Sequence, residues 1–204
     1  MNARRRTSTA ASFALAATLA FTGCTIVADR GGDGGDGMDH DGMGQTDGSA
    51  EFDQADIMFA QMMIPHHEQA IEMSDIILAK DGVDPEVVEL AEEIRAAQGP
   101  EIEQMESWLD EWGVPTMMDD DGMGGMDGMA GMLSEEEIDE LEAADGATGT
   151  TLFLEGMIEH HEGAIDMAEQ HQENGESDEA LELSASIIET QTAEIERMQQ
   201  LLAR

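Results

Sequence analysis

The chain has 204 residues with 41% hydrophobic content, enough for one compact domain, and its 47 acidic residues against eight basic ones give a formal net charge of −39. Such a charge repels nucleic acid and anionic lipid head groups, so we predict that the protein has no nucleic-acid partner. A single cysteine excludes a disulfide within the chain.

The first 23 residues have the organisation of a secretion signal. Three arginines, at positions 4–6, precede an apolar run from Ala10 to Phe21 that is too short to span a bilayer as a stable helix. Small residues then lead to Cys24, and this order resembles a bacterial lipoprotein signal, in which the cysteine becomes the lipidated first residue. We therefore expect a protein outside the cytoplasm that is anchored to the cell membrane through Cys24, with plain secretion as the alternative.

Residues 24–51 are mostly glycine, aspartate and small polar residues, so we predict a flexible tether without a core. Residues 52–112 predict a first helical hairpin. Asp81-Gly82 ends its first helix, and Asp84 followed by Pro85 begins a second helix that runs to Trp112. The first helix has an apolar stripe at three- and four-residue spacing, made of Phe59, Met62, Met63, His66, Ala70, Met73 and Ile77.

Residues 113–132 form a second segment rich in glycine and aspartate, in which methionines recur every three residues from Met123 to Met132. Methionines in such an acidic background indicate a low-affinity collector of soft metal ions, with low-complexity drift as the alternative reading.

Residues 133–204 predict a short helix followed by a second hairpin. The short helix begins with a capping box between Ser134 and Glu137. In the hairpin, Asn174-Gly175 ends the first helix and Ser177 begins the last one. Two hairpins with one apolar face each can bury those faces by packing together, so we predict an all-α fold, an antiparallel four-helix bundle that comprises residues 52–204.

A histidine pair accompanied by methionine occurs in both hairpins. Met62-Met63-Ile64-Pro65-His66-His67 is matched 94 positions later by Gly156-Met157-Ile158-Glu159-His160-His161. A core needs apolar volume and gains nothing from imidazole, so the duplication indicates a binding site. Helical spacing places one histidine of each pair inside the stripe and the other at its edge, both one turn from a methionine. The candidate metal ligands are His66, His67, Met62, Met63, Met73, His160, His161, Met157, Met167 and His171.

Thioether and imidazole together favour Cu(I), and Ag(I) as its analogue. Zinc is the alternative, held by a histidine pair with Glu68 or Glu162, although the chain has no HExxH motif. No histidine has a glutamate three positions earlier, which is the arrangement of di-iron bundles. Methionines on a helix stripe also commonly fill a core, and this reading stays open for Met73 and Met167.

The second helix of each hairpin carries a glutamine and, three residues on, a glutamate. Gln98 and Gln191 are predicted to hydrogen-bond between helices or to a histidine ring. Glu101 and Glu194 are predicted to belong to a solvated face.

These motifs resemble those of the domain-of-unknown-function 305 family of secreted bacterial proteins. The resemblance rests on residues 59–67, on Gln69-Ala70-Ile71, on the run from Gln98 to Leu109, and on their second copies. It implies a ferritin-like four-helix bundle and a copper role for His66, His67, His160 and His161 with nearby methionines. The second copy departs where Gly156 replaces Met62 and Leu201 replaces Trp108, which implies unequal metal occupancy of the two halves.

The sequence thus predicts an envelope-anchored protein without enzymatic activity that sequesters Cu(I) or passes it to a copper-handling partner of unknown identity. Two alternatives remain at this stage. One is a ferritin-like metal-dependent oxidase, and the other is an envelope adaptor that binds another protein and no metal.

Overall fold

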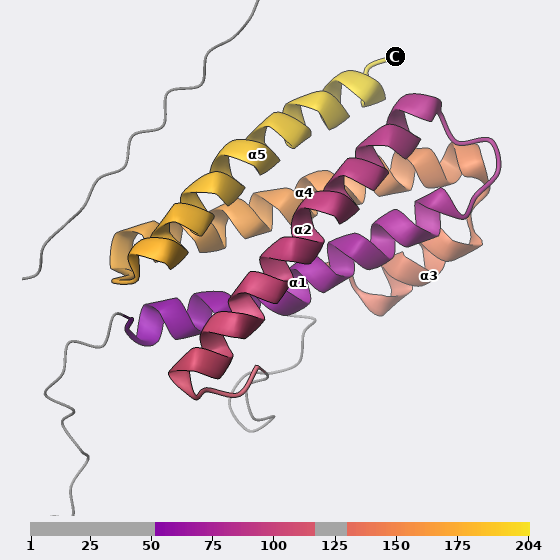
Figure 1. Ribbon diagram of the computed structural model, residues 1–204. Helices are drawn as coiled ribbons and strands as arrows, with labels where there is room; N and C mark the ends of the chain where they lie inside the picture. The colour runs from indigo at the N-terminus through magenta and orange to yellow at the C-terminus, as the bar shows by residue number, and fades with distance from the viewer. Residues whose placement is uncertain (1–51, 117–129) are drawn as a thin grey trace, which may run out of the picture. The chain divides into compact units, whose positions relative to one another are not determined.

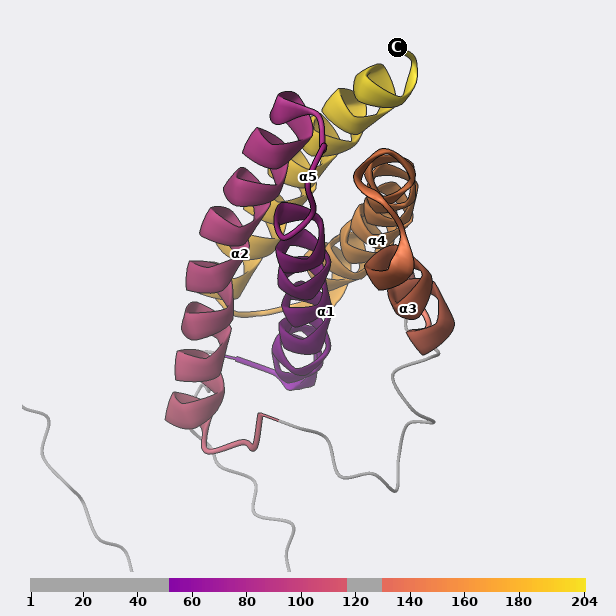
Figure 2. The same cartoon turned by 90° about the vertical axis from the view of Figure 1, so that its right-hand side faces the viewer.

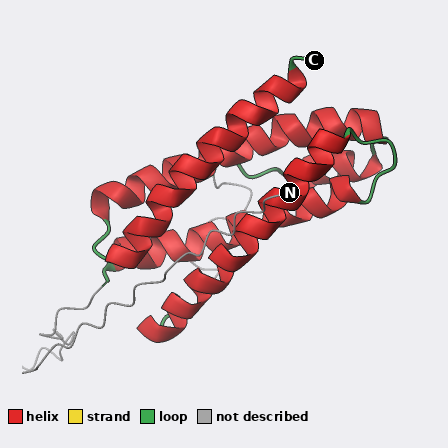
Figure 3. Cartoon of the chain, turned by 45° about the horizontal axis from the view of Figure 1, so that its top comes forward, coloured by secondary structure: helices red, strands yellow, loops and turns green. Residues whose placement is uncertain are grey.

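The computed structural model describes residues 52–116 and 130–204. The predicted signal and lipidation site, the predicted tether and most of the predicted methionine-rich loop lie outside the described residues. Every regular element in these two ranges is an α-helix (Figure 3). The helices are α1 (Gln54–Leu78), α2 (Pro85–Trp112), α3 (Glu135–Ala143), α4 (Gly146–Asn174) and α5 (Asp178–Leu202).

Local sequence determines most of the helix ends. Asp84 caps α2 through the backbone N–H of Glu86, Pro85 is its first residue, and Gly113 ends it in the left-handed conformation with φ of 70°. The predicted capping box between Ser134 and Glu137 begins α3. Helix α1 ends at Leu78, three residues before the predicted stop, and Gly82 instead forms the following turn with φ of 83°.

The helices form the predicted all-α, antiparallel four-helix bundle. Helix α1 packs mainly on α2 and helix α4 mainly on α5, and the two hairpins meet through α1 and α4 (Figure 1). Helices α2 and α5 touch each other little, and surface ion pairs such as those of Arg197 with Glu89 and Glu93 connect them. Helix α3 lies against α1 and α4 (Figure 2).

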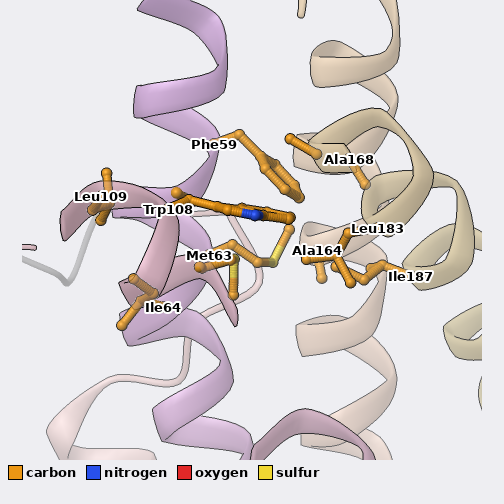
Figure 4. Close-up of a cluster of buried hydrophobic side chains, with 12 residues drawn as sticks. Phe59, Met63, Ile64, Trp108, Leu109, Ala164, Ala168, Leu183 and Ile187 are labelled. Atoms are coloured by element: carbon orange, nitrogen blue, oxygen red, sulfur yellow. The ribbon is translucent and has the colours of Figure 1, made fainter. Parts of the chain in front are cut away.

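The core consists of two separate apolar clusters. The first apolar cluster takes residues 59–64 of α1 and residues 164–168 of α4, and in Figure 4 the ring of Trp108 lies beside Phe59 and Met63. The second apolar cluster takes residues 70–77 of α1 and residues 153–157 of α4. The two helices therefore contribute in opposite order, as antiparallel neighbours do. The duplicated histidine pairs fall between the two clusters on both helices.

The only lysine of the chain fixes α3. The Nζ of Lys80 donates hydrogen bonds to the backbone oxygens of Glu142 and Ala144, at 2.8 and 2.9 Å, at the C-terminal end of α3. A Cβ at Gly149 would lie 3.0 Å from the Lys80 Cδ, so this glycine leaves room for the lysine stem. Leu141, on the apolar side of α3, is buried in the second apolar cluster.

A buried carboxylate connects the two hairpins. The side chain of Asp56 is fully buried, accepts a hydrogen bond from Nε2 of His171 at 2.8 Å, and also accepts from the backbone N–H groups of Asp53, Glu176 and Ser177. Burial acts to raise the pKa of Asp56, but these hydrogen bonds outweigh it, and the pKa is lowered. The start of α1 is thereby fixed to the turn between α4 and α5.

We expect Asp56→Ala to destabilise the bundle by more than about 3 kcal/mol, because several buried donors would lose a charged acceptor at once. Urea unfolding measures the change. The control is Asp84→Ala, which removes an exposed helix cap and should cost about 1 kcal/mol. Equal effects of the two substitutions would show that the Asp56 connection adds nothing beyond helix capping.

Candidate metal centre

A polar layer separates the two apolar clusters. Each of the four bundle helices contributes two residues to it, so that the layer repeats the pattern of the sequence. We call it the histidine layer, and it comprises His66 and His67 of α1, Gln98 and Glu101 of α2, His160 and His161 of α4, and Gln191 and Glu194 of α5. All four imidazoles are fully buried, including the two that the sequence places at the edge of the stripe.

His66 and His160 meet across the interface between α1 and α4, with ring centroids 3.8 Å apart and planes inclined by 41°. Burial, together with the nearby His67, lowers the pKa of His66 to about 3. Burial and the neighbouring histidines, His66 first among them, lower the pKa of His160 well below its ordinary value. Both rings are therefore neutral near pH 7, and neutral imidazole is the form that binds a metal ion.

Three of the four imidazoles have an acceptor at Nε2. The His67 Nε2–H donates to Glu101 at 2.8 Å and the His161 Nε2–H donates to Glu194 at 2.6 Å. The His66 Nε2–H donates to the backbone oxygen of Ala130 at 3.1 Å. Because a carboxylate or carbonyl oxygen can only accept, Nε2 of each of these three rings carries a proton, and in the neutral form of the ring the lone pair lies on Nδ1. Metal-binding histidines are oriented by partners of this kind.

The buried side-chain nitrogen and oxygen atoms that lack a hydrogen-bond partner in the described residues all belong to the histidine layer. They are Nδ1 of His66, His67 and His161, both ring nitrogens of His160, both amide atoms of Gln98, and Oε1 of Gln191. Buried polar groups in folded proteins are nearly always paired, so a metal ion, another ligand or water is needed to satisfy these atoms. The Nδ1 lone pairs and the glutamine oxygens are donors that a metal ion could use.

Methionine sulfurs lie on both sides of the layer. Met63 belongs to the first apolar cluster and Met157 to the second, and each precedes a histidine pair by one helical turn. Both side chains are fully buried, as is Met73, whose methyl group approaches Gly156. Met63 and Met157 are therefore the thioethers closest in sequence to the two histidine pairs.

The other three candidate ligands lie elsewhere. Met62, Met167 and His171 line one pocket, which the start of α1 and the end of α4 form. Both nitrogens of His171 have partners, Asp56 at Nε2 and Ser184 Oγ at Nδ1 at 2.9 Å, and its ring stacks on Phe59 at 4.2 Å. The ten candidate residues thus separate into the histidine layer with its adjoining methionines and this pocket.

Sequence reasoning missed the part that Glu101 and Glu194 play, since both were predicted to be solvated. The clue was the identical Gln-x-x-Glu spacing from Gln98 and from Gln191, which places each glutamate one turn from a layer residue. Conversely, Glu68 and Glu162, the carboxylates of the zinc alternative, are exposed.

Within residues 52–116 and 130–204, no three His, Cys, Asp or Glu side chains are grouped closely enough to hold a metal ion by themselves. The other side-chain donors in or beside the histidine layer of the described ranges are the glutamine oxygens and the thioether sulfurs of Met63 and Met157. Thioether sulfur is a ligand that soft metal ions prefer.

The segment that precedes α3 covers the histidine layer. Besides the contact between Ala130 and His66, the Gln69 side chain donates to the Leu133 oxygen at 2.9 Å and accepts from the Leu133 N–H at 2.8 Å. A Cβ on Gly163 would lie 2.0 Å from the Ala130 oxygen, so only glycine permits this approach to α4.

None of the helices in the described ranges combines the length and the apolar character that a membrane span requires. Among curated proteins, no sequence matches this chain.

Solved structures do match it. The chain is similar to a DUF305 protein from Streptomyces coelicolor that is described as secreted, with 37% identity, coverage of 73% of this chain and 92% of the other, and a TM-score of 0.68. A DUF305 fragment from Deinococcus radiodurans is 30% identical, with 74% and 97% coverage and a TM-score of 0.68. CopM in its Cu(II)-bound form is 35% identical, with 72% and 94% coverage and a TM-score of 0.60. CopM also has solved structures with Cu(I) and with Ag.

The family model described as domain of unknown function (DUF305) matches residues 56–202, which include the whole histidine layer and all four bundle helices except the first two residues of α1. The chain therefore belongs to the DUF305 family.

Proposed function

We propose that the protein binds a soft monovalent metal ion, Cu(I) or its analogue Ag(I), in the histidine layer, and that it sequesters this ion or delivers it outside the cytoplasm. The observation that carries the proposal is the concentration of unpartnered buried donors in that layer. Histidine binds a metal ion as a neutral ring, with a proton on one nitrogen and a lone pair on the other. The neutral ring of His66 and the acceptors at Nε2 of His67 and His161 fit this state.

The choice of ion rests on the donors. His66 and His160 are in contact, and Met63 and Met157 approach the layer from opposite sides. Cu(I) and Ag(I) accept few ligands and prefer imidazole and thioether. The structures of CopM with Cu(I) and with Ag support the same ions, since CopM and this chain share the fold at 31–32% identity in these structures. We propose that Met73, His67 and His161 lie at the edge of the site and modify its affinity for the ion.

The protein is further proposed to act in the cell envelope. The S. coelicolor relative is described as secreted, and the sequence places Cys24 directly after a signal-like segment. A lipid on Cys24 would keep a strongly acidic protein at a membrane surface that otherwise repels it.

The first prediction concerns metal binding by the full-length protein. Anaerobic titration with Cu(I), in competition with a chromophoric Cu(I) chelator, should shift the imidazole NMR signals of His66 and His160 at about one equivalent. His66→Ala with His160→Ala should lose nitrogen coordination in X-ray absorption and weaken affinity at this site at least about tenfold. Binding in the wild type without any change of the imidazole signals would contradict the proposal. Oxygen consumption after air is admitted to the Cu(I)-loaded protein would favour the oxidase.

A milder pair of variants guards against loss of the fold. Glu101→Gln keeps the size of the side chain but removes the charge beside His67, and it should reduce Cu(I) affinity by about 10–100-fold. The matched control is Glu103→Gln, an exposed glutamate on the same helix, which should leave the affinity unchanged. Identical affinities for the two variants would count against the layer as the site.

The second prediction concerns the metal-free protein in acid. The pKa of His66 is about 3 in the folded chain against an ordinary value of 6.5, so the unfolded chain binds more protons between these values and stability falls as the pH falls below 6.5. For each such histidine the slope approaches about 1.4 kcal/mol per pH unit. Urea unfolding from pH 6.5 to 5.0 should therefore show a smaller slope for the double variant His66→Gln, His160→Gln, and equal slopes would refute the assignment.

The third prediction concerns the anchor. Expressed in a bacterium, the wild-type protein should be found in the membrane fraction and should incorporate a labelled fatty acid. Cys24→Ser should be found in the soluble or secreted fraction without label. If the Cys24→Ser protein stayed in the membrane fraction, the protein would be attached to the membrane by a route other than a lipid on Cys24.

A further inference from the structure

A pocket of about 250 Å³ lies outside the histidine layer, between the start of α1 and the end of α4. Three of its lining side chains are methionines. Met58 and Met62 are one turn apart on α1, and Met167 comes from α4. Met58 is 39% exposed, which makes it one of two exposed large hydrophobic side chains in the described residues. The lining residues are Ala55, Met58, Phe59, Met62, Met167, Gln170, His171 and Asn174.

The other half of the bundle shows that packing does not require two of these methionines, Met58 and Met62. Positions 94 residues apart correspond, so Leu152 and Gly156 stand where the pocket has Met58 and Met62. There the Leu133 side chain lies over Gly156, since a Cβ on that glycine would be 3.0 Å from the Leu133 Cδ2. In one half this place is thus closed by Leu133, and the methyl group of Met73, the counterpart of Met167, also lies close to Gly156. In the other half it is open and lined with three thioethers.

Both ring nitrogens of His171, the imidazole of the pocket, are hydrogen-bonded. The side-chain amide nitrogens of Gln170 and Asn174 donate to backbone oxygens of their own helix, and their amide oxygens are hard donors that a soft ion disfavours. The soft donors of the pocket are the sulfurs of the three methionines. They are uncharged and polarisable, and such ligands select Cu(I) and Ag(I) and not Zn²⁺, Mg²⁺ or Ca²⁺.

We propose that Met58, Met62 and Met167 form a second, thioether-only site for a soft monovalent ion. It is independent of the histidine layer, because no layer residue lines the pocket. The exposure of Met58 makes the site accessible from solvent, whereas the imidazoles of the layer are fully buried. The strong negative charge of the chain raises the local concentration of cations around such a surface site. The two sites therefore differ in their donor atoms and in their access to solvent. This difference suits rapid exchange of the ion at the pocket and retention of the ion in the histidine layer.

The test uses the full-length protein labelled with ¹³C on the methionine methyl groups and titrated with Ag(I), which undergoes no redox chemistry here. Single Met→Leu variants assign the signals, and such substitutions conserve volume. The methyl signals of Met58, Met62 and Met167 should shift together with one common saturation point. They should do so equally in the double variant His66→Ala, His160→Ala. Signals that stay unmoved, or that shift at three different Ag(I) concentrations, would overturn the proposal.

A matched control separates the site from methionine content. The triple variant Met58→Leu, Met62→Leu, Met167→Leu should bind one Ag(I) fewer than the wild type, while Met198→Leu, a buried methionine of the second apolar cluster, should bind the full number. An unchanged stoichiometry in the triple variant would refute the site. If the three methyl signals respond but the imidazole signals do not, the pocket stands and the proposed function of the histidine layer fails.

Discussion

The contact between the imidazoles of His66 and His160 is the constraint around which the bundle is built. It lies where α1 crosses α4, and it divides the core into two apolar clusters that do not join. Hydrocarbon side chains would fill the same space at lower cost, since each unpaired buried polar group costs about 1–3 kcal/mol. An ion that pairs with these atoms would stabilise the fold as it binds.

The parts of the fold that local chemistry determines could be predicted from the sequence. Asp84 with Pro85, Ser134 with Glu137, and Ser177 mark helix starts because their side chains satisfy nearby backbone N–H groups. The burial of His66 follows from its position in the apolar stripe of α1. The repeated motif then predicts the same for His160.

The rest of the site depends on contacts between helices, which periodicity along one helix does not give. His67 and His161 are predicted at the edge of the stripe, yet α2 and α5 cover that edge and supply Glu101 and Glu194 as acceptors. Met62 shares a helix with His66, but its side chain lines the pocket outside the histidine layer, together with Met167 of α4. The difference between the two halves also comes from contacts between separate segments. In one half the Leu133 side chain packs over α4, where Gly156 leaves room for it.

The single lysine has a chemical consequence of its own. Because Lys80 uses its ammonium group to hold two carbonyl oxygens at the end of α3, its nucleophilicity depends on whether that short helix is docked. No other side-chain amine exists in the chain to compete for an acylating reagent. Covalent footprinting of this one amine would therefore report the attachment of α3, and with it the position of the segment that covers the imidazoles, without any engineered label.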